Sequence, residues 1–89
     1  MLNMLYHFPK VRFVDENNIY GQVAHIQTEA DEAFRELSTG DIDALADEIM
    51  DTMHSCETAM RILEKSHGVN PNAVMMRVYE KNEKRGYYQ

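Results

Sequence analysis

Two acidic quartets in the middle of the chain have the residue types and the spacing of a metal site. Glu29-Ala-Asp-Glu32 and Glu48-Ile-Met-Asp51 are separated by 15 residues. Helix residues three apart lie on one face, with Cβ atoms about 5–6 Å apart, so each quartet would present two carboxylates side by side. Such a cluster repels itself unless a multivalent cation neutralises it, and hard oxygen ligands suit Mg²⁺ or Mn²⁺.

Helical periodicity predicts the elements that would position these carboxylates. Apolar or small residues recur at intervals of four and three in two segments, and in both segments acidic residues stand one position before a member of the stripe. If the two stripes pack as an antiparallel hairpin, both acidic edges flank the seam between the helices. The stripes consist of Ile19, Val23, Ile26, Ala30, Ala33 and Leu37, then of Leu45, Ile49, Thr52, Cys56, Ala59 and Leu63.

The expected helix boundaries are marked by capping residues. Gly40 would end one helix and Asp41 would cap the next, while Asn70 is a cap followed by Pro71 at the first helical position. The sequence therefore predicts a single all-α domain over residues 1–89, with a helical hairpin plus a third helix. The expected helices span residues 19–38, 41–66 and 71–84. They form a helical core at 19–85, preceded by an N-terminal arm at 1–18 with a short extended stretch at 11–14.

A chain of 89 residues buries only about 60% of its unfolded surface, which leaves it marginally stable alone. The second predicted helix also has more apolar surface than one packing partner covers. We therefore expect a homo-oligomer, a dimer or a tetramer, built as a four-helix bundle; a monomer with a buried central helix is the alternative. The additional apolar residues are Ile42, Ala46, Met50, Met53 and Met60.

Composition and charge exclude several classes of protein. A net charge of −6 disfavours binding to a nucleic acid polymer. The sequence has no apolar run long enough for a membrane span and no leader typical of a signal peptide. Cys56 is the only cysteine, so no internal disulfide can form, and it is expected to be a small buried residue of the stripe. Together these features favour a cytoplasmic protein.

Charge is also unevenly distributed along the chain. Nine acidic residues but only one basic residue, Arg35, lie between Glu29 and Asp51, whereas residues 81–85 are basic on balance. This asymmetry fits an anion held between metal ions and cationic side chains.

The two quartets and the spacer between them resemble the MazG-like family of all-α nucleoside triphosphate pyrophosphohydrolases. The resemblance spans residues 22–87 and includes the terminal segment from Lys81 to Tyr87. It implies hydrolysis between the α- and β-phosphates of a nucleoside triphosphate, with Mg²⁺ as cofactor. It also implies roles for individual residues. The metal ligands would be Glu29, Glu32, Glu48 and Asp51, with Glu32 or Glu29 deprotonating the attacking water, and the phosphates would contact Lys81, Asn82 and Arg85.

Two other functions remain open at this stage. One is phosphoribosyl-ATP pyrophosphatase, whose helical acidic core is similar. The other is a non-catalytic acidic helical interaction module. The sequence also leaves undecided whether four aromatic or imidazole side chains contribute to the site: His25, His54, Tyr87 and Tyr88.

Overall fold

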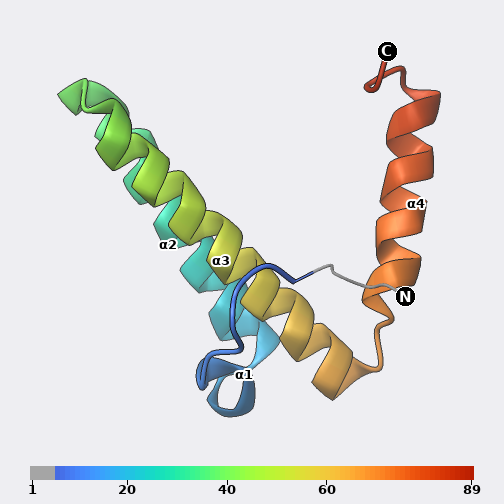
Figure 1. Cartoon of the computed structure of the whole chain (residues 1–89). Helices are drawn as coiled ribbons and strands as arrows, with labels where there is room; N and C mark the ends of the chain where they lie inside the picture. Colours follow the sequence, from blue (N-terminus) through green and yellow to red (C-terminus); the bar gives the residue numbers. More distant parts are fainter. Residues whose placement is uncertain (1–5) are drawn as a thin grey trace.

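The computed structural model describes residues 6–89, and over this range the chain is helical with short connections and no strand. This confirms the all-α prediction. Figure 1 shows a long helical hairpin, a separate C-terminal helix and an N-terminal segment that crosses the hairpin. The elements are α1 (Phe13–Glu16), α2 (Ile19–Glu36), the 3₁₀ turn η1 (Leu37–Thr39), α3 (Ile42–His67) and α4 (Pro71–Lys84).

The helix ends follow the capping residues. The side chain of Asp41 accepts a hydrogen bond from the backbone N–H of Ala44, and Asn70 accepts from Ala73. Gly40 has a φ of 73°, in the left-handed region that glycine adopts without a steric penalty. The predicted boundaries are thus confirmed to within two residues. The largest difference is at the end of α2, where a 3₁₀ turn replaces the last helical residues.

The expectation of an extended stretch at residues 11–14 is wrong, because Arg12 already has right-handed helical backbone angles and α1 begins at the next residue. Phe13 and Val14 belong to α1, in which the N–H of Asn17 donates to the carbonyl of Phe13 at 2.8 Å. Val14 is buried. A helix of four residues is too short to show a period in the sequence, so pattern analysis could not detect it. Residues 1–5 of the predicted arm lie outside the described residues.

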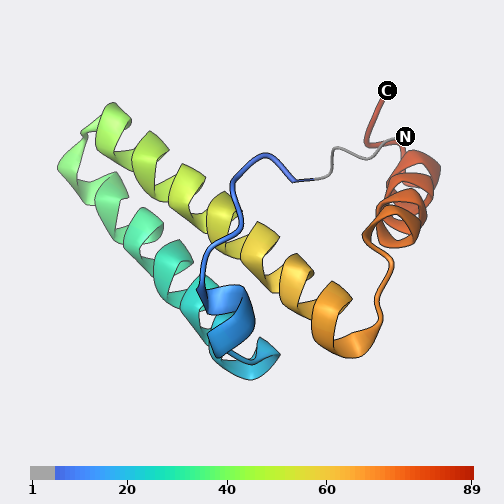
Figure 2. The same ribbon diagram turned by 60° about the horizontal axis from the view of Figure 1, so that its bottom comes forward.

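The N-terminal segment is fastened across α3 by polar contacts. The Glu57 carboxylate accepts the backbone N–H groups of His7 and Phe8, both at 2.9 Å. Arg61 donates to the carbonyl of Phe8 at 2.8 Å, and the Phe8 ring stacks on His54 with 4.3 Å between centroids. These contacts position the residues that follow, up to α1, beside the hairpin (Figure 2).

Helices α2 and α3 lie side by side and antiparallel in both views (Figures 1 and 2), which confirms the predicted hairpin. Seven of the twelve stripe positions are buried or half-buried as expected, so the predicted packing face is confirmed in part. Five stripe positions that we expected in the seam are exposed, and their preceding residues are buried or half-buried in their place. The exposed five are Val23, Ala30, Leu37, Ile49 and Cys56, and the five in the seam are Gln22, Glu29, Glu36, Glu48 and Ser55.

One buried hydrogen bond between the helices favours this register. The Gln22 side chain, only 3% exposed, donates its amide N–H to the carbonyl of Ser55 at 3.1 Å. A buried polar group that is satisfied in this way need not be excluded from a helix contact. Cys56 is consequently exposed, contrary to expectation.

Helix α4 stands apart from the hairpin along its whole length (Figure 1) and has no buried residue. An apolar groove of about 450 Å³ lies between α4 and the end of α3. Its lining includes Met60, Val74, Met75, Val78 and Tyr79. Among residues 6–89, no helix combines the length and the apolar character needed to cross a membrane.

Candidate metal centre

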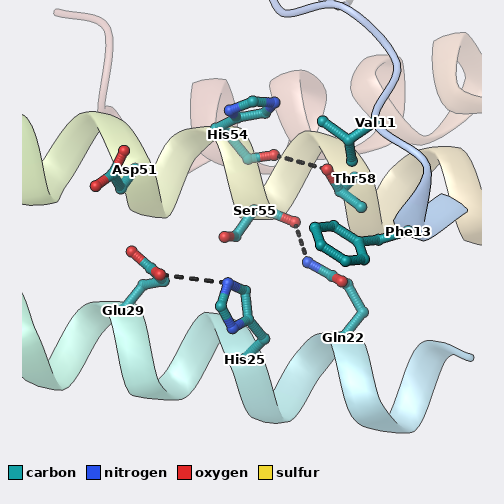
Figure 3. A pocket seen from close by; sticks show the side chains of 9 residues that line it. All are labelled: Val11, Phe13, Gln22, His25, Glu29, Asp51, His54, Ser55 and Thr58. Carbon is teal, nitrogen blue, oxygen red and sulfur yellow. Dashed lines mark hydrogen bonds and ion pairs between the residues drawn. The ribbon is translucent and has the colours of Figure 1, made fainter. Parts of the chain in front are cut away.

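Three carboxylates from the two helices of the hairpin meet at the seam. Glu29 extends from α2, and Glu48 and Asp51 extend from α3. One oxygen atom of each lies within 4.8 Å of the others. Figure 3 shows Glu29 and Asp51 facing each other from opposite helices. The prediction that the two quartets converge is therefore confirmed for three of the four residues, and the antiparallel packing of α2 on α3 is what brings them together.

Glu32, the fourth predicted ligand, lies beside this triad. Its side chain is exposed and borders an adjoining hollow of about 380 Å³, which Glu48 also lines. Arg35 also lines this hollow. Glu32 thus belongs to the same acidic surface but not to the compact group of three oxygens.

Electrostatics single out Glu48 as the centre of this cluster. Burial raises the pKa of its carboxyl, and the negative charges of Glu32, Asp51, Glu29 and Glu36 raise it further. Its Oε2 atom is buried and has no hydrogen-bond partner among the described residues. An unsatisfied buried acceptor surrounded by like charges is costly, and a bound cation would relieve both conditions.

The two candidate histidines have different positions. The His25 Nε2 atom lies 3.2 Å from a carboxylate oxygen of Glu29, one turn away on α2. His25 can therefore orient Glu29 within the cluster. His54 stacks on Phe8, which places its ring against the N-terminal segment. Both residues line the neighbouring pocket, but only His25 contacts a carboxylate of the cluster.

A pocket of about 260 Å³ adjoins the carboxylates on this side of the hairpin (Figure 3). The N-terminal segment forms one wall with Val11 and Phe13, and the bonded pair Gln22 and Ser55 lies between the helices. Sequence reasoning missed these four residues. The only signal for them was two polar residues, Gln22 and Ser55, each one position before a member of the apolar stripe.

The predicted phosphate-binding residues are not brought to the carboxylates within one chain. Lys81 and Asn82 lie in the last turn of α4 and Arg85 directly follows it, on the helix that diverges from the hairpin (Figure 1). The two terminal tyrosines pack locally. Tyr88 stacks on Tyr79 with centroids 5.0 Å apart, and the Arg85 guanidinium lies 5.9 Å from the Tyr87 ring.

Comparison of the chain with protein-family models, with curated proteins and with solved structures yields no match. The resemblance to MazG-like enzymes therefore stays a prediction from the motif.

Proposed function

We propose that the protein is a metal-dependent nucleotide pyrophosphohydrolase, which converts a nucleoside triphosphate to a monophosphate and pyrophosphate. The observation that supports this most directly is the meeting of Glu29, Glu48 and Asp51, from two facing helices, with oxygens within 4.8 Å. Carboxylates at the seam of a helical hairpin fit the acidic motif that suggested this chemistry.

The residues present fit a hard divalent cation. All three donors are carboxylate oxygens, which Mg²⁺ and Mn²⁺ prefer, and the buried Oε2 of Glu48 lacks any other partner among the described residues. Glu29, Glu48 and Asp51 would hold the ion, with Glu32 alongside. When bound, such an ion neutralises phosphate charge and lowers the pKa of a water molecule.

Glu32 is the better candidate for the base that accepts a proton from the attacking water. It is exposed, so substrate and water can reach it, whereas Glu29 is engaged by His25 at 3.2 Å. In the reaction the water oxygen bonds to the α-phosphorus and the bond from that phosphorus to the α–β bridging oxygen breaks. The water proton passes to the carboxylate, and pyrophosphate leaves.

The surroundings of the cluster offer places for the rest of the substrate. The pocket beside the carboxylates, walled by Phe13 and Gln22, would take the nucleoside. We propose a homo-oligomer, a dimer or a tetramer, in which Lys81, Asn82 and Arg85 of one copy reach the phosphates at another copy's carboxylates. Nucleotide substrates would place the protein in the cytoplasm.

The direct test is a panel of nucleoside triphosphates, with phosphoribosyl-ATP included, assayed for pyrophosphate release with Mg²⁺ or Mn²⁺. In ¹⁸O-labelled water the label should appear in the monophosphate. Cleavage of phosphoribosyl-ATP alone would identify the histidine-biosynthesis reaction instead. Diphosphate plus orthophosphate would contradict the proposed bond cleavage, and no cleavage of any nucleotide would favour the interaction module.

A further inference from the structure

The carboxylate cluster lies between two hollows along the hairpin. The pocket walled by the N-terminal segment, about 260 Å³, includes Glu29 and Asp51 of the cluster in its lining. The hollow of about 380 Å³ includes Glu48 and lies toward the connection between the helices, so we call it the turn hollow. A ligand that starts in the pocket and is long enough to pass the carboxylates would therefore reach the turn hollow. The turn hollow is lined by Glu32, Arg35, Glu36, Thr39 and Glu48.

Arg35 is the single cation that lines the turn hollow. Its side chain is exposed, and the ion pairs that the described residues form all involve other side chains. One carboxylate of the hollow is already held, because the hydroxyl of Thr39 donates to Glu36 Oε1 at 3.0 Å. The guanidinium of Arg35 is thus free to bind an anion that enters the hollow.

We infer, on the basis of the proposed hydrolysis, that Arg35 binds the β- and γ-phosphates of the substrate, the part that leaves as pyrophosphate. The nucleoside would occupy the pocket beside Phe13, and the α-phosphate would lie at the carboxylates. Arg35 follows Glu29 by six residues, which is about 9 Å along the axis of α2. The guanidinium therefore lies on the leaving-group side of the bond that breaks, where its planar fork can donate two parallel hydrogen bonds to phosphate oxygens.

A cation near the leaving phosphates would offset the negative charge that surrounds this site. Five carboxyl groups contribute to that charge, and a single divalent cation neutralises only part of it before the phosphates add more. The predicted cations of α4 stand apart from the hairpin (Figure 1), whereas Arg35 comes from the same helix as Glu29. The five carboxyl groups belong to Glu29, Glu32, Glu36, Glu48 and Asp51.

Arg35 has a second possible role, which is to stabilise the folded chain. It lies in the last turn of α2, where a cation interacts favourably with the helix dipole and with the neighbouring carboxylates. The two roles are distinguished by the ligand. A nearby positive charge opposes the binding of Mg²⁺, so in either role Arg35→Ala should bind Mg²⁺ as tightly as wild type or more tightly. Only a phosphate contact makes the same variant bind pyrophosphate more weakly once Mg²⁺ is present.

Calorimetric titration of the full chain measures both affinities, first for Mg²⁺ alone and then for inorganic pyrophosphate at saturating Mg²⁺. Arg35→Ala should weaken pyrophosphate binding at least about tenfold, the effect of removing hydrogen bonds to a charged group. Arg35→Lys keeps the charge but not the planar fork, so its loss should be about threefold. The matched control is Arg77→Ala, which makes the same change of charge on α4 outside residues 81–85 and should stay within about twofold of wild type.

Two results would overturn the inference. One is an unchanged pyrophosphate affinity in folded Arg35→Ala, and the other is an equal loss in Arg77→Ala, which would show an effect of net charge alone. Circular dichroism checks folding, and if Arg35→Ala does not fold, Arg35→Lys provides the comparison with Arg77→Ala. The binding measurement is separate from catalysis. Nucleotide cleavage with no dependence of pyrophosphate binding on Arg35 would remove only this contact, whereas Arg35-dependent binding of pyrophosphate without cleavage of any nucleotide would support the contact and contradict the proposed hydrolysis.

Discussion

The two sides of the α2–α3 hairpin are built from the same helices and differ in almost every chemical respect. One side presents carboxylates, histidines and the polar pocket, and the N-terminal segment crosses it. The other side presents exposed apolar side chains, among them Val23, Phe34 and Ile49. A step of one residue separates the two patterns on each helix, since Glu29 is followed by Ala30 and Glu48 by Ile49. A rotation of about 100° is thus enough to give one helix two chemically different sides.

The largest effect should come from removing the proposed base on the carboxylate side. We expect Glu32→Gln to lower pyrophosphate release by at least about 100-fold, because it removes a general base or a ligand beside the metal. Circular dichroism should show unchanged helicity, since the side chain is exposed. Asp31→Asn, the neighbouring carboxylate on the back of α2, should keep near wild-type activity and serves as the control. A loss of less than twofold in Glu32→Gln would exclude this role for Glu32.

A second prediction concerns the stabilisation of the fold by Mg²⁺, which should depend on the carboxylate side of the hairpin. Mg²⁺ at 100 times its dissociation constant should stabilise the fold by about 2.7 kcal/mol. For a domain of this size that is a rise in Tm of about 10–20 °C. Glu48→Gln and Asp51→Asn should abolish the rise, whereas Asp43→Asn, at the exposed start of α3, should retain it. Without metal, Glu48→Gln should be more stable than wild type, because burial and the neighbouring negative charges disfavour the ionised Glu48. An undiminished Mg²⁺ response in both site variants would contradict a shared site.

A smaller effect is expected for the basic tail. If Arg85 contacts substrate phosphates, Arg85→Ala should raise KM about tenfold, because the substitution removes one charge-assisted hydrogen bond to the substrate. Lys84→Ala is the neighbouring control. Steady-state kinetics at several enzyme concentrations would show whether the contact requires a second copy. Equal kinetics for Arg85→Ala and wild type would remove the tail from the site.

The smallest predicted effect concerns the attachment of the N-terminal segment. Burial alone would raise the pKa of Glu57, but the N–H donors of Phe8 and His7 outweigh it and lower the pKa below 4.5. Its stabilising contribution is therefore fully present above pH 4.5 and is lost as the pH falls through the lower folded-state value. Glu57→Gln should cost about 1–2 kcal/mol at pH 7. Urea unfolding should show that this difference shrinks in acid, and a difference that is constant with pH would argue against the attachment.

Glu48 should respond to acid in the opposite sense. Because its pKa is raised in the folded chain, protonation stabilises the fold as the pH falls toward and through the ordinary carboxyl range. The stability of Glu48→Gln relative to wild type should therefore be greatest at neutral pH. Acid thus loosens the segment that walls the pocket while it relaxes the repulsion within the carboxylate cluster.

The sequence was sufficient for the three long helices, their caps and the meeting of three of the four predicted carboxylates, because these depend on local spacing and on one short connection. It was not sufficient for the face through which the helices pack. Val23 and Gln22 are adjacent, and the periodicity favoured the apolar residue although the buried one is Gln22, satisfied by Ser55. A single apolar period cannot show whether it belongs to the hairpin seam or to a second contact surface. The pocket wall was also missed, because Phe13 lies in a helix too short to have a period.

The way the N-terminal segment is fastened has a consequence for the order of folding. Its hydrogen bonds to α3 join residues 49 to 58 positions apart, such as Phe8 to Glu57 and Tyr6 to Glu64, whereas the hairpin closes through a connection of a few residues at Gly40. Local contacts form sooner, because closing a long loop costs more chain entropy. We expect the hairpin and its carboxylates to form first and the wall of the pocket to dock last. In native-state hydrogen exchange the amides of His7 and Phe8 should open before those at the centre of α3, so the pocket would be assembled and dismantled while the carboxylate cluster persists.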